Sequence, residues 1–340
     1  MIPVYLQHAY QHIPRNGQLR RAIANTCNAV HRVLVVDHAG ACFLCHCDAW
    51  LPISVGTITD FSELDQVWTN DIARDLQMDL AQKKFTWCAV DRCGIEQQDV
   101  YFDKYTISIN IDESCNLSCP SCRRGPIMID SGPVYDRKIQ QVRHLIGLLE
   151  RFEKPAHIIM SGNGDPLAST IMRPILHEYQ PKPTQTFRLF TNGLLLRKQL
   201  EKSAILPYIS QYFISIDAGS ADVYHDVRRP GRWSVLLDNL NYLREVVQHT
   251  RAEVLLKFVL QQSNHHDMQN FIDLCRNYKF RGVINRLEDW GTWDEFDRHD
   301  VIGNQQHPDH AAAMRNLATV MAHRSPLIQF NASLEQIANA

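Results

Sequence analysis

The chain carries one loop of unusual composition, ESCNLSCPSCRR at residues 113–124, directly after a β-prone run at residues 105–110. The loop places Cys115, Cys119 and Cys122 at spacings of four and three residues, so that three sulfurs can reach one centre. A ferredoxin run supplies further cysteines in a tighter repeat, whereas this loop stops at three. It therefore predicts an iron–sulfur site that keeps one position free for another ligand, as catalytic metal sites do. Zinc with a distant fourth ligand is the alternative.

The segments around this loop alternate between β-prone and helical patterns. The expected strands are residues 105–110, 157–161, 186–190, 212–217, 254–260 and 282–287, and the expected helices are 138–152, 194–203, 234–249 and 268–279. Such alternation predicts βαβ units and an α/β fold with a parallel sheet. Six units are too few for an eight-fold barrel, which favours a partial (β/α)6 barrel over residues 99–302. A smaller cysteine-rich domain is expected over residues 1–98, and a helical tail over 303–340.

Polar motifs follow the expected strands in order, where barrel enzymes place their active sites. The second strand is followed by Ser161-Gly-Asn-Gly-Asp-Pro166 and the third ends at Thr191-Asn-Gly193. The fourth ends at Ser215-Ile-Asp217, with Arg228 further on. Taken singly, each glycine motif indicates a plain turn, and a lone arginine indicates a solvated surface charge. The information lies in their order along the chain.

With these motifs the chain resembles the radical S-adenosylmethionine (radical SAM) superfamily over about residues 100–290. The resemblance implies a four-iron cluster on Cys115, Cys119 and Cys122, whose open iron chelates S-adenosylmethionine and whose electron releases a 5′-deoxyadenosyl radical. It further implies that the cofactor is bound by Gly162, Gly164, Asp165, Asn192, Ser215, Asp217 and Arg228. Two positions depart from the family pattern. Ser121 replaces a residue that is often aromatic, and Asp165 replaces a glutamate.

The composition is that of a soluble globular protein, with 45% hydrophobic and 21% charged residues. A formal net charge of −2 gives no indication of a nucleic-acid or membrane partner. The segment 1–17 lacks the apolar core of a signal peptide, so a cytoplasmic location is expected. Nine of the ten cysteines lie between Cys27 and Cys122. In a reducing compartment such a cluster favours metal binding over disulfides.

The N-terminal region is expected to form a strand at residues 32–37, a turn at Gly40 and a helix near residues 65–83. Its cysteines resemble the SPASM or shorter twitch module, which carries auxiliary iron–sulfur clusters and in most relatives follows the barrel. The resemblance assigns one auxiliary cluster to Cys27, Cys45, Cys88 and Cys93. Two cysteines are left over, Cys42 and Cys47, which either replace one of the four, build a second partial site or stay unligated. The alternative is structural zinc on Cys42, Cys45, Cys88 and Cys93, with or without His46.

The expected reaction begins with hydrogen abstraction from a C–H bond, because the cofactor supplies the radical and the protein supplies orientation. By resemblance we expect a peptide or protein side chain as substrate and an external electron donor such as flavodoxin or ferredoxin. Oxidation or rearrangement of a small molecule, such as a sugar or nucleotide, stays open. A non-catalytic iron–sulfur electron carrier or binding protein is the alternative from another class. No general acid or base is assigned, since lone histidines such as His46, His265 and His266 are more often surface or packed residues.

Overall fold

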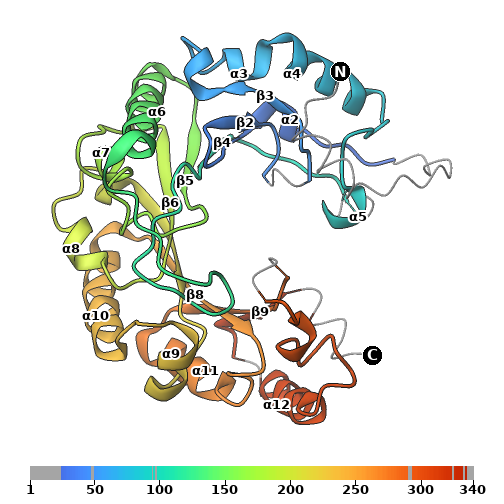
Figure 1. Cartoon of the computed structure of the whole chain (residues 1–340), viewed down its shortest axis with the longest axis vertical. Coiled ribbons are helices and arrows are strands. Elements are labelled where there is room, and N and C mark those ends of the chain that lie inside the picture. The colour runs from blue at the N-terminus through green and yellow to red at the C-terminus, as the bar shows by residue number, and fades with distance from the viewer. Residues whose placement is uncertain are drawn as a thin grey trace. The chain divides into compact units, whose positions relative to one another are not determined.

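The first strand of the chain, β1 (Val33–Val36), is apolar and buried at every position. A strand buried on both faces must lie inside a sheet rather than at its edge. Accordingly β1 pairs in parallel with β4 (Tyr105–Ile109) and antiparallel with β2 (Ala41–Phe43). Next, β3 (Ser54–Thr57) pairs antiparallel with β2, and β5 (Ala156–Met160) pairs in parallel with β4 (Figure 1). The N-terminal region thus extends the sheet that contains β4.

The computed structural model describes residues 24–46, 50–93, 95, 98–289, 293–323, 325–331 and 334. The chain folds as two units, and the strands above belong to the first, which comprises residues 1–113, 129–163 and 170–187. The second unit comprises residues 114–128, 164–169 and 188–340.

Helices of the first unit follow local signals in the sequence. The helix expected near residues 65–83 is split into α3 (Gln66–Thr69) and α4 (Asp71–Ala81), because the Asn70 side chain accepts a hydrogen bond from Ala73 N and caps the second helix. The helix expected at 138–152 begins earlier, as α6 (Gly132–Arg151), with a proline in its first turn. The remaining helical elements are α2 (Ala29–Arg32), η1 (Ile58–Asp60), α5 (Val90–Cys93) and α7 (Arg173–His177).

The turn between β1 and β2 requires Gly40, as the sequence indicates. Its φ of +86° lies in the left-handed region, and a Cβ there would come within 2.2 Å of the Gln141 side chain of α6. The Asp37 carboxylate accepts hydrogen bonds from Ala39 N and Ala41 N and closes the same turn.

The second unit is built on parallel strands that alternate with helices. Strand β6 (Gln185–Thr191) enters it at Arg188, and β7 (Ile209–Ser215), β8 (Glu253–Leu260), β9 (Arg281–Arg286) and β10 (Ile328–Phe330) pair in parallel in that order. The helices are α8 (Leu196–Leu200), η2 (Leu206–Tyr208), α9 (Ala221–Val227), α10 (Trp233–Thr250), α11 (Met268–Tyr278), η3 (Phe296–Arg298) and α12 (His310–Ala322). The predicted α/β class with a parallel sheet is confirmed.

The strands of the second unit have two different faces. On one face Phe258 contacts Phe271 of α11, and a Cβ on Gly282 would lie 2.7 Å from the Cys275 sulfur of the same helix. Cys275 is therefore a core residue, and burial raises its pKa to about 12. The other face, here called the inner face, carries Phe190, Phe213, Ser215, Leu255, Lys257, Val259 and Val283, which are all partly exposed. None of the helices in the described part of the chain is long and apolar enough to cross a membrane.

Candidate functional site

The three-cysteine loop is fixed by its own backbone hydrogen bonds. Cys115 N donates to Ile127 O at 2.9 Å, which ties the start of the loop to its end. Cys122 N and Arg123 N both donate to Cys119 O, at 2.9 and 3.0 Å, and form a tight turn between the second and third cysteines. Cys115 and Cys119 are 9% and 5% exposed, whereas Cys122 is exposed. Two ligands thus sit inside the fold and one faces solvent.

Each sulfur of the loop has a nitrogen donor within hydrogen-bonding distance. Cys115 Sγ accepts from Leu117 N at 3.4 Å and from Asn192 Nδ2 at 3.9 Å. Cys119 Sγ lies 3.8 Å from Arg228 Nη1, and Cys122 Sγ lies 3.8 Å from Arg123 Nη2. Burial raises the pKa of Cys115 to about 11 and also raises the pKa of Cys119, which Arg228 partly offsets. Donors around sulfur favour the thiolate, the form that binds iron.

Arg228 and Asp217 form a buried ion pair beside the loop. Arg228 Nη2 lies 2.5 Å from Asp217 Oδ2, and the two side chains are 14% and 3% exposed. Asp217 has a φ of +56° just beyond the end of β7, and its other oxygen accepts from Val259 N at 2.8 Å. Burial opposes the charge of Arg228, but Asp217 and Cys119 outweigh it and raise the pKa of the guanidinium. The pair therefore places a permanent positive charge on Cys119.

Asp165 holds two of the predicted motifs together. Its carboxylate accepts from Asn192 N at 2.6 Å, from Thr191 Oγ1 at 2.9 Å and from Leu167 N at 2.9 Å. Its own N donates to Ser114 O at 2.8 Å. Burial raises the pKa of this carboxyl despite those donors. Because its oxygens are bonded to the chain, Asp165 positions Asn192, whose side chain reaches Cys115 and Asn116.

The remaining predicted cofactor residues are placed as follows. Gly162, in the first unit, has a φ of +128°, and a Cβ there would lie 3.2 Å from Asn110 Cα, so only glycine allows this approach to the end of β4. Gly164 directly precedes Asp165 and is partly exposed. Ser215 ends β7 on the inner face.

Two polar atoms near Cys119 are buried without a hydrogen-bond partner: Tyr224 Oη of α9 and Arg228 Nε. Burial raises the pKa of Tyr224, with Arg228 and Cys119 as its nearest electrostatic neighbours. A Cβ on Gly231 would lie 3.0 Å from Tyr224 Oη, so this glycine makes room for the phenol. Unpaired buried polar groups are rare in native proteins and indicate a missing ligand. These atoms, together with the sulfur donors, fit a polar cofactor bound beside an iron–sulfur cluster.

Lys257 is a functional candidate that the sequence analysis overlooked. A single lysine interrupts the apolar strand β8, and that interruption is the signal by which it was detectable. Its Nζ lies 5.6 Å from the centre of the Phe190 ring, which stacks on Phe213 at 4.2 Å. Desolvation lowers the pKa of Lys257. It brings a positive charge to an otherwise largely apolar inner face.

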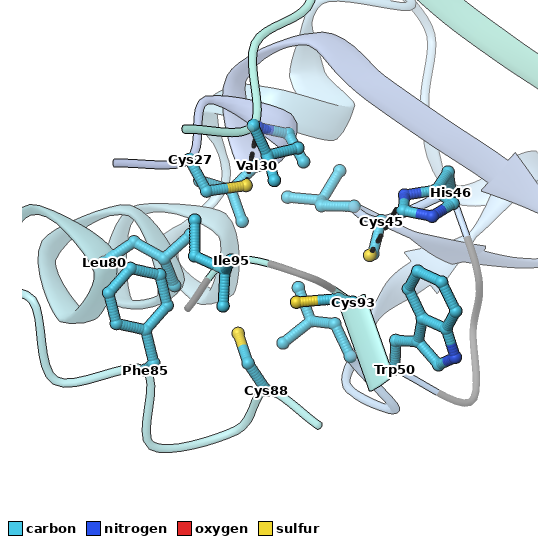
Figure 2. Close-up of a pocket in the computed structure, with 14 residues that line it drawn as sticks. Cys27, Val30, Cys45, His46, Trp50, Leu80, Phe85, Cys88, Cys93 and Ile95 are labelled. Atoms are coloured by element: carbon cyan, nitrogen blue, oxygen red, sulfur yellow. Dashed lines mark hydrogen bonds between the residues drawn. The ribbon is translucent and has the colours of Figure 1, made fainter. Parts of the chain in front are cut away.

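A second group of cysteines lies in the first unit. Cys27, Cys45, Cys88 and Cys93 line one pocket, and Figure 2 shows their side chains directed into the same space. They come from four separate segments: before α2, after β2, after α4 and from the end of α5. Burial raises the pKa of Cys88, and the three other cysteines raise it further, which reflects their proximity. The rest of the wall is apolar and includes Val30, Leu80, Phe85 and Ile95.

The two leftover cysteines do not line this pocket as far as the structure describes them. Cys42 is fully buried within β2, with its sulfur 4.0 Å from Gly40 O. Cys47 lies outside the described residues. His46 does line the pocket, and its Nδ1 lies 3.9 Å from Cys45 Sγ. Over the described ranges, no three His, Cys, Asp or Glu side chains converge closely enough to hold a single metal ion.

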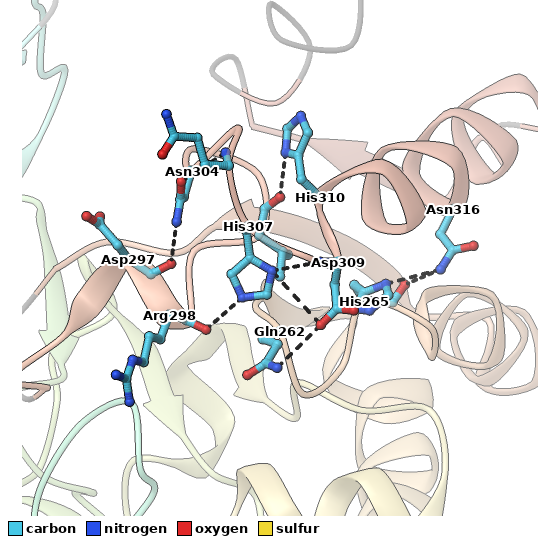
Figure 3. Close-up of polar contacts among 11 residues, drawn as sticks. Gln262, His265, Asp297, Arg298, Asn304, His307, Asp309, His310 and Asn316 are labelled. Atoms are coloured by element: carbon cyan, nitrogen blue, oxygen red, sulfur yellow. Dashed lines mark hydrogen bonds and ion pairs between the residues drawn. The ribbon is translucent and has the colours of Figure 1, made fainter.

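Histidines of the second unit anchor the C-terminal segment (Figure 3). His307 Nε2 lies 2.9 Å from Arg298 O, and its Nδ1 accepts from Asp309 N at 3.0 Å. His265 contacts Asn316 of α12 at 3.2 Å. These contacts fasten the segment around η3 and α12 to the loop that follows β8.

Comparisons with known proteins agree with this geometry. The sequence pattern described as "Radical SAM superfamily" matches residues 109–275. Similar solved structures include Streptococcus suis SuiB bound to precursor peptide SuiA, with 14% identity over 81% of this chain and 68% of that chain and a TM-score of 0.42. A radical SAM methyltransferase from Sphaerobacter thermophilus has 16% identity over 70% of each chain and a TM-score of 0.43. The chain spans 46% of SuiB in its S-adenosylmethionine complex, with 15% identity over 66% of this chain and a TM-score of 0.40. No curated protein matches the chain.

Proposed function

We propose, from the premise that this chain belongs to the radical SAM superfamily and is an enzyme, that it abstracts hydrogen from a peptide or protein side chain. When bound, the cluster passes one electron to the sulfonium of S-adenosylmethionine, which releases methionine and a 5′-deoxyadenosyl radical. The observation that carries the proposal is the arrangement around Cys119, where a buried ion pair and two unpartnered polar atoms stand beside the cysteine loop.

The residues of the site divide the work among them. Cys115, Cys119 and Cys122 hold the cluster, and the nitrogen donors around their sulfurs stabilise the thiolates. Asp165 is a positioning residue that sets Asn192 beside Cys115. Arg228 and Tyr224 offer polar atoms to the amino-acid part or the ribose of the cofactor.

The inner face favours a peptide side chain over a sugar. The stacked rings of Phe190 and Phe213 and the aliphatic side chains of Leu255 and Val283 present apolar surface, with Lys257 as the nearby cation. A sugar carries many hydroxyls, and each needs a hydrogen-bond partner once it leaves water. An aliphatic or aromatic side chain needs none.

We further propose that Cys27, Cys45, Cys88 and Cys93 hold an auxiliary iron–sulfur cluster. The four side chains line one pocket, and Cys42, the zinc alternative to Cys27, is absent from its wall among the described residues. Four thiolates would saturate such a cluster, which suits it to exchange electrons rather than to bind substrate.

The test uses anaerobically reconstituted protein with S-adenosylmethionine, an electron source and peptides encoded beside the gene. We expect 5′-deoxyadenosine to form, and one peptide to raise its yield while changing mass by the hydrogen that it loses. Cys119→Ala should form none. A Cys119→Ala variant that makes 5′-deoxyadenosine at the normal rate would refute the site, and turnover of a sugar or nucleotide alone would refute the peptide.

A further inference from the structure

A hollow of about 320 Å³ lies on the second unit, directly beside the cysteine loop. Its wall is formed by Ser118, Pro120, Arg123, Arg124, Arg229 and Trp293. Arginine and tryptophan are the residue types most enriched at the energetic centres of protein–protein interfaces. The composition of this wall therefore suits contact with another protein.

The hollow marks the side on which the cluster site is nearest to solvent. Cys122 is exposed, while Cys115 and Cys119 are buried. Arg123 and Arg124 follow Cys122 directly in the chain and line the hollow. Because electron transfer weakens steeply with distance, an electron from outside has its shortest route through this side of the loop.

The hollow is positively charged. Arg124 pairs with Asp294 at 2.6 Å, but both side chains are largely exposed, so the pair is weak and screened by salt. Arg229 is exposed, and its backbone carbonyl accepts from Ser118 N at 2.7 Å, which holds it against the cysteine loop. Three arginines against one aspartate leave a local excess of positive charge, although the whole chain has a net charge of −2.

We propose that this hollow docks an acidic one-electron carrier protein of the flavodoxin or ferredoxin type. The proposal rests on the proposed function, because it takes the loop to hold the cluster. One electron leaves the reduced carrier and enters the oxidised cluster, so that the carrier is oxidised by one electron and the cluster is reduced by one. No proton or chemical group moves. Positive charge on the enzyme and negative charge on the carrier would accelerate their encounter.

The test measures the Kd of an oxidised, acidic flavodoxin for reconstituted enzyme at low ionic strength. The double variant Arg124→Glu with Arg229→Glu should weaken binding by about tenfold or more and flatten its salt dependence. The matched control is Arg244→Glu, an exposed arginine of α10 that does not line this hollow, and it should bind as wild type does. Cluster reduction by photoreduced deazaflavin, a small reductant that needs no docking, should be unchanged in both variants.

The outcomes separate the two levels of the argument. A double variant that binds flavodoxin within twofold of wild type, or a control that loses binding equally, overturns the docking surface. Deazaflavin-driven formation of 5′-deoxyadenosine would still occur in that case, and the proposed function would stand. If wild-type protein itself forms none with deazaflavin, the proposed function fails first.

Discussion

The two cysteine sites of this chain are built in opposite ways. The first takes three cysteines from one short loop and surrounds them with an arginine, an asparagine and an ion pair. The second gathers four cysteines from four segments between residues 27 and 93 and encloses them in apolar walls. A local, polar, three-ligand site leaves room for a cofactor to react. A dispersed, apolar, four-ligand site closes the metal off and ties the surrounding chain together.

The largest expected effect separates the two sites completely. Replacing Cys115, Cys119 and Cys122 together by Ala should abolish 5′-deoxyadenosine formation and lower the iron content from about eight to about four per chain, since each cluster holds four irons. The brown charge-transfer absorbance should persist at roughly half its strength. A colourless triple variant would remove the second cluster from the comparison, and one bound zinc per chain would favour the structural-zinc alternative.

The next prediction tests which four cysteines form the dispersed site. Cys27→Ala should remove about four irons while leaving the loop cluster intact, because Cys27 lines the pocket with the other three cysteines. Cys42→Ala is the matched control, since that side chain is buried in β2 away from the lining residues. Iron analysis and unfolding by urea would follow both variants. The reverse pattern, with iron lost only from Cys42→Ala, would contradict the assignment.

The smallest of the expected effects concerns the polar surroundings of the loop. Arg228→Ala should weaken S-adenosylmethionine binding by about 1.5–3 kcal/mol, the range for a hydrogen bond to a charged group. It should also lower the free energy of unfolding by about 3–5 kcal/mol, because Asp217 would be left buried without its partner.

Calorimetric titration and urea unfolding would measure the two losses separately. Pairing Arg228→Ala with Asp217→Asn should restore much of the stability but not the cofactor affinity. Lys198→Ala, an exposed residue of α8, serves as the control and should change neither quantity. Unaltered cofactor binding in Arg228→Ala would reduce this arginine to a structural role.

The strands were predictable because each is a short run of β-prone residues followed by a turn signal. Expected and observed boundaries of the parallel strands agree closely, and the largest shift is in β7, which begins at Ile209 rather than 212. The break at Asn70 was missed because helix periodicity continues through it, while the capping hydrogen bond to Ala73 shows only in three dimensions. The short strands β2 and β3 carry too few residues to show any period.

The site divides in the same way. Motif order identified Asp165, Asp217 and Arg228 as site residues, but not their partners. Asp165 is bonded to Thr191 and Asn192, and Asp217 is bonded to Arg228. Such pairings depend on which strand ends meet in space. Tyr224 lies on α9 with no neighbouring motif, so nothing in the sequence distinguishes it from an ordinary core tyrosine.

The pairing of β1 with β4 limits how this chain can be divided. Four residues of β1 form a continuous parallel ladder with β4, from Val33 opposite Thr106 to Val36 opposite Ile109. A fragment that starts near residue 99 would expose β4 along that ladder as an unprotected, apolar edge, and such edges recruit other chains. The cysteine-rich region is therefore no detachable accessory. Shortened versions for expression, and any ancestor that lacked the region, would need another way to cover that edge.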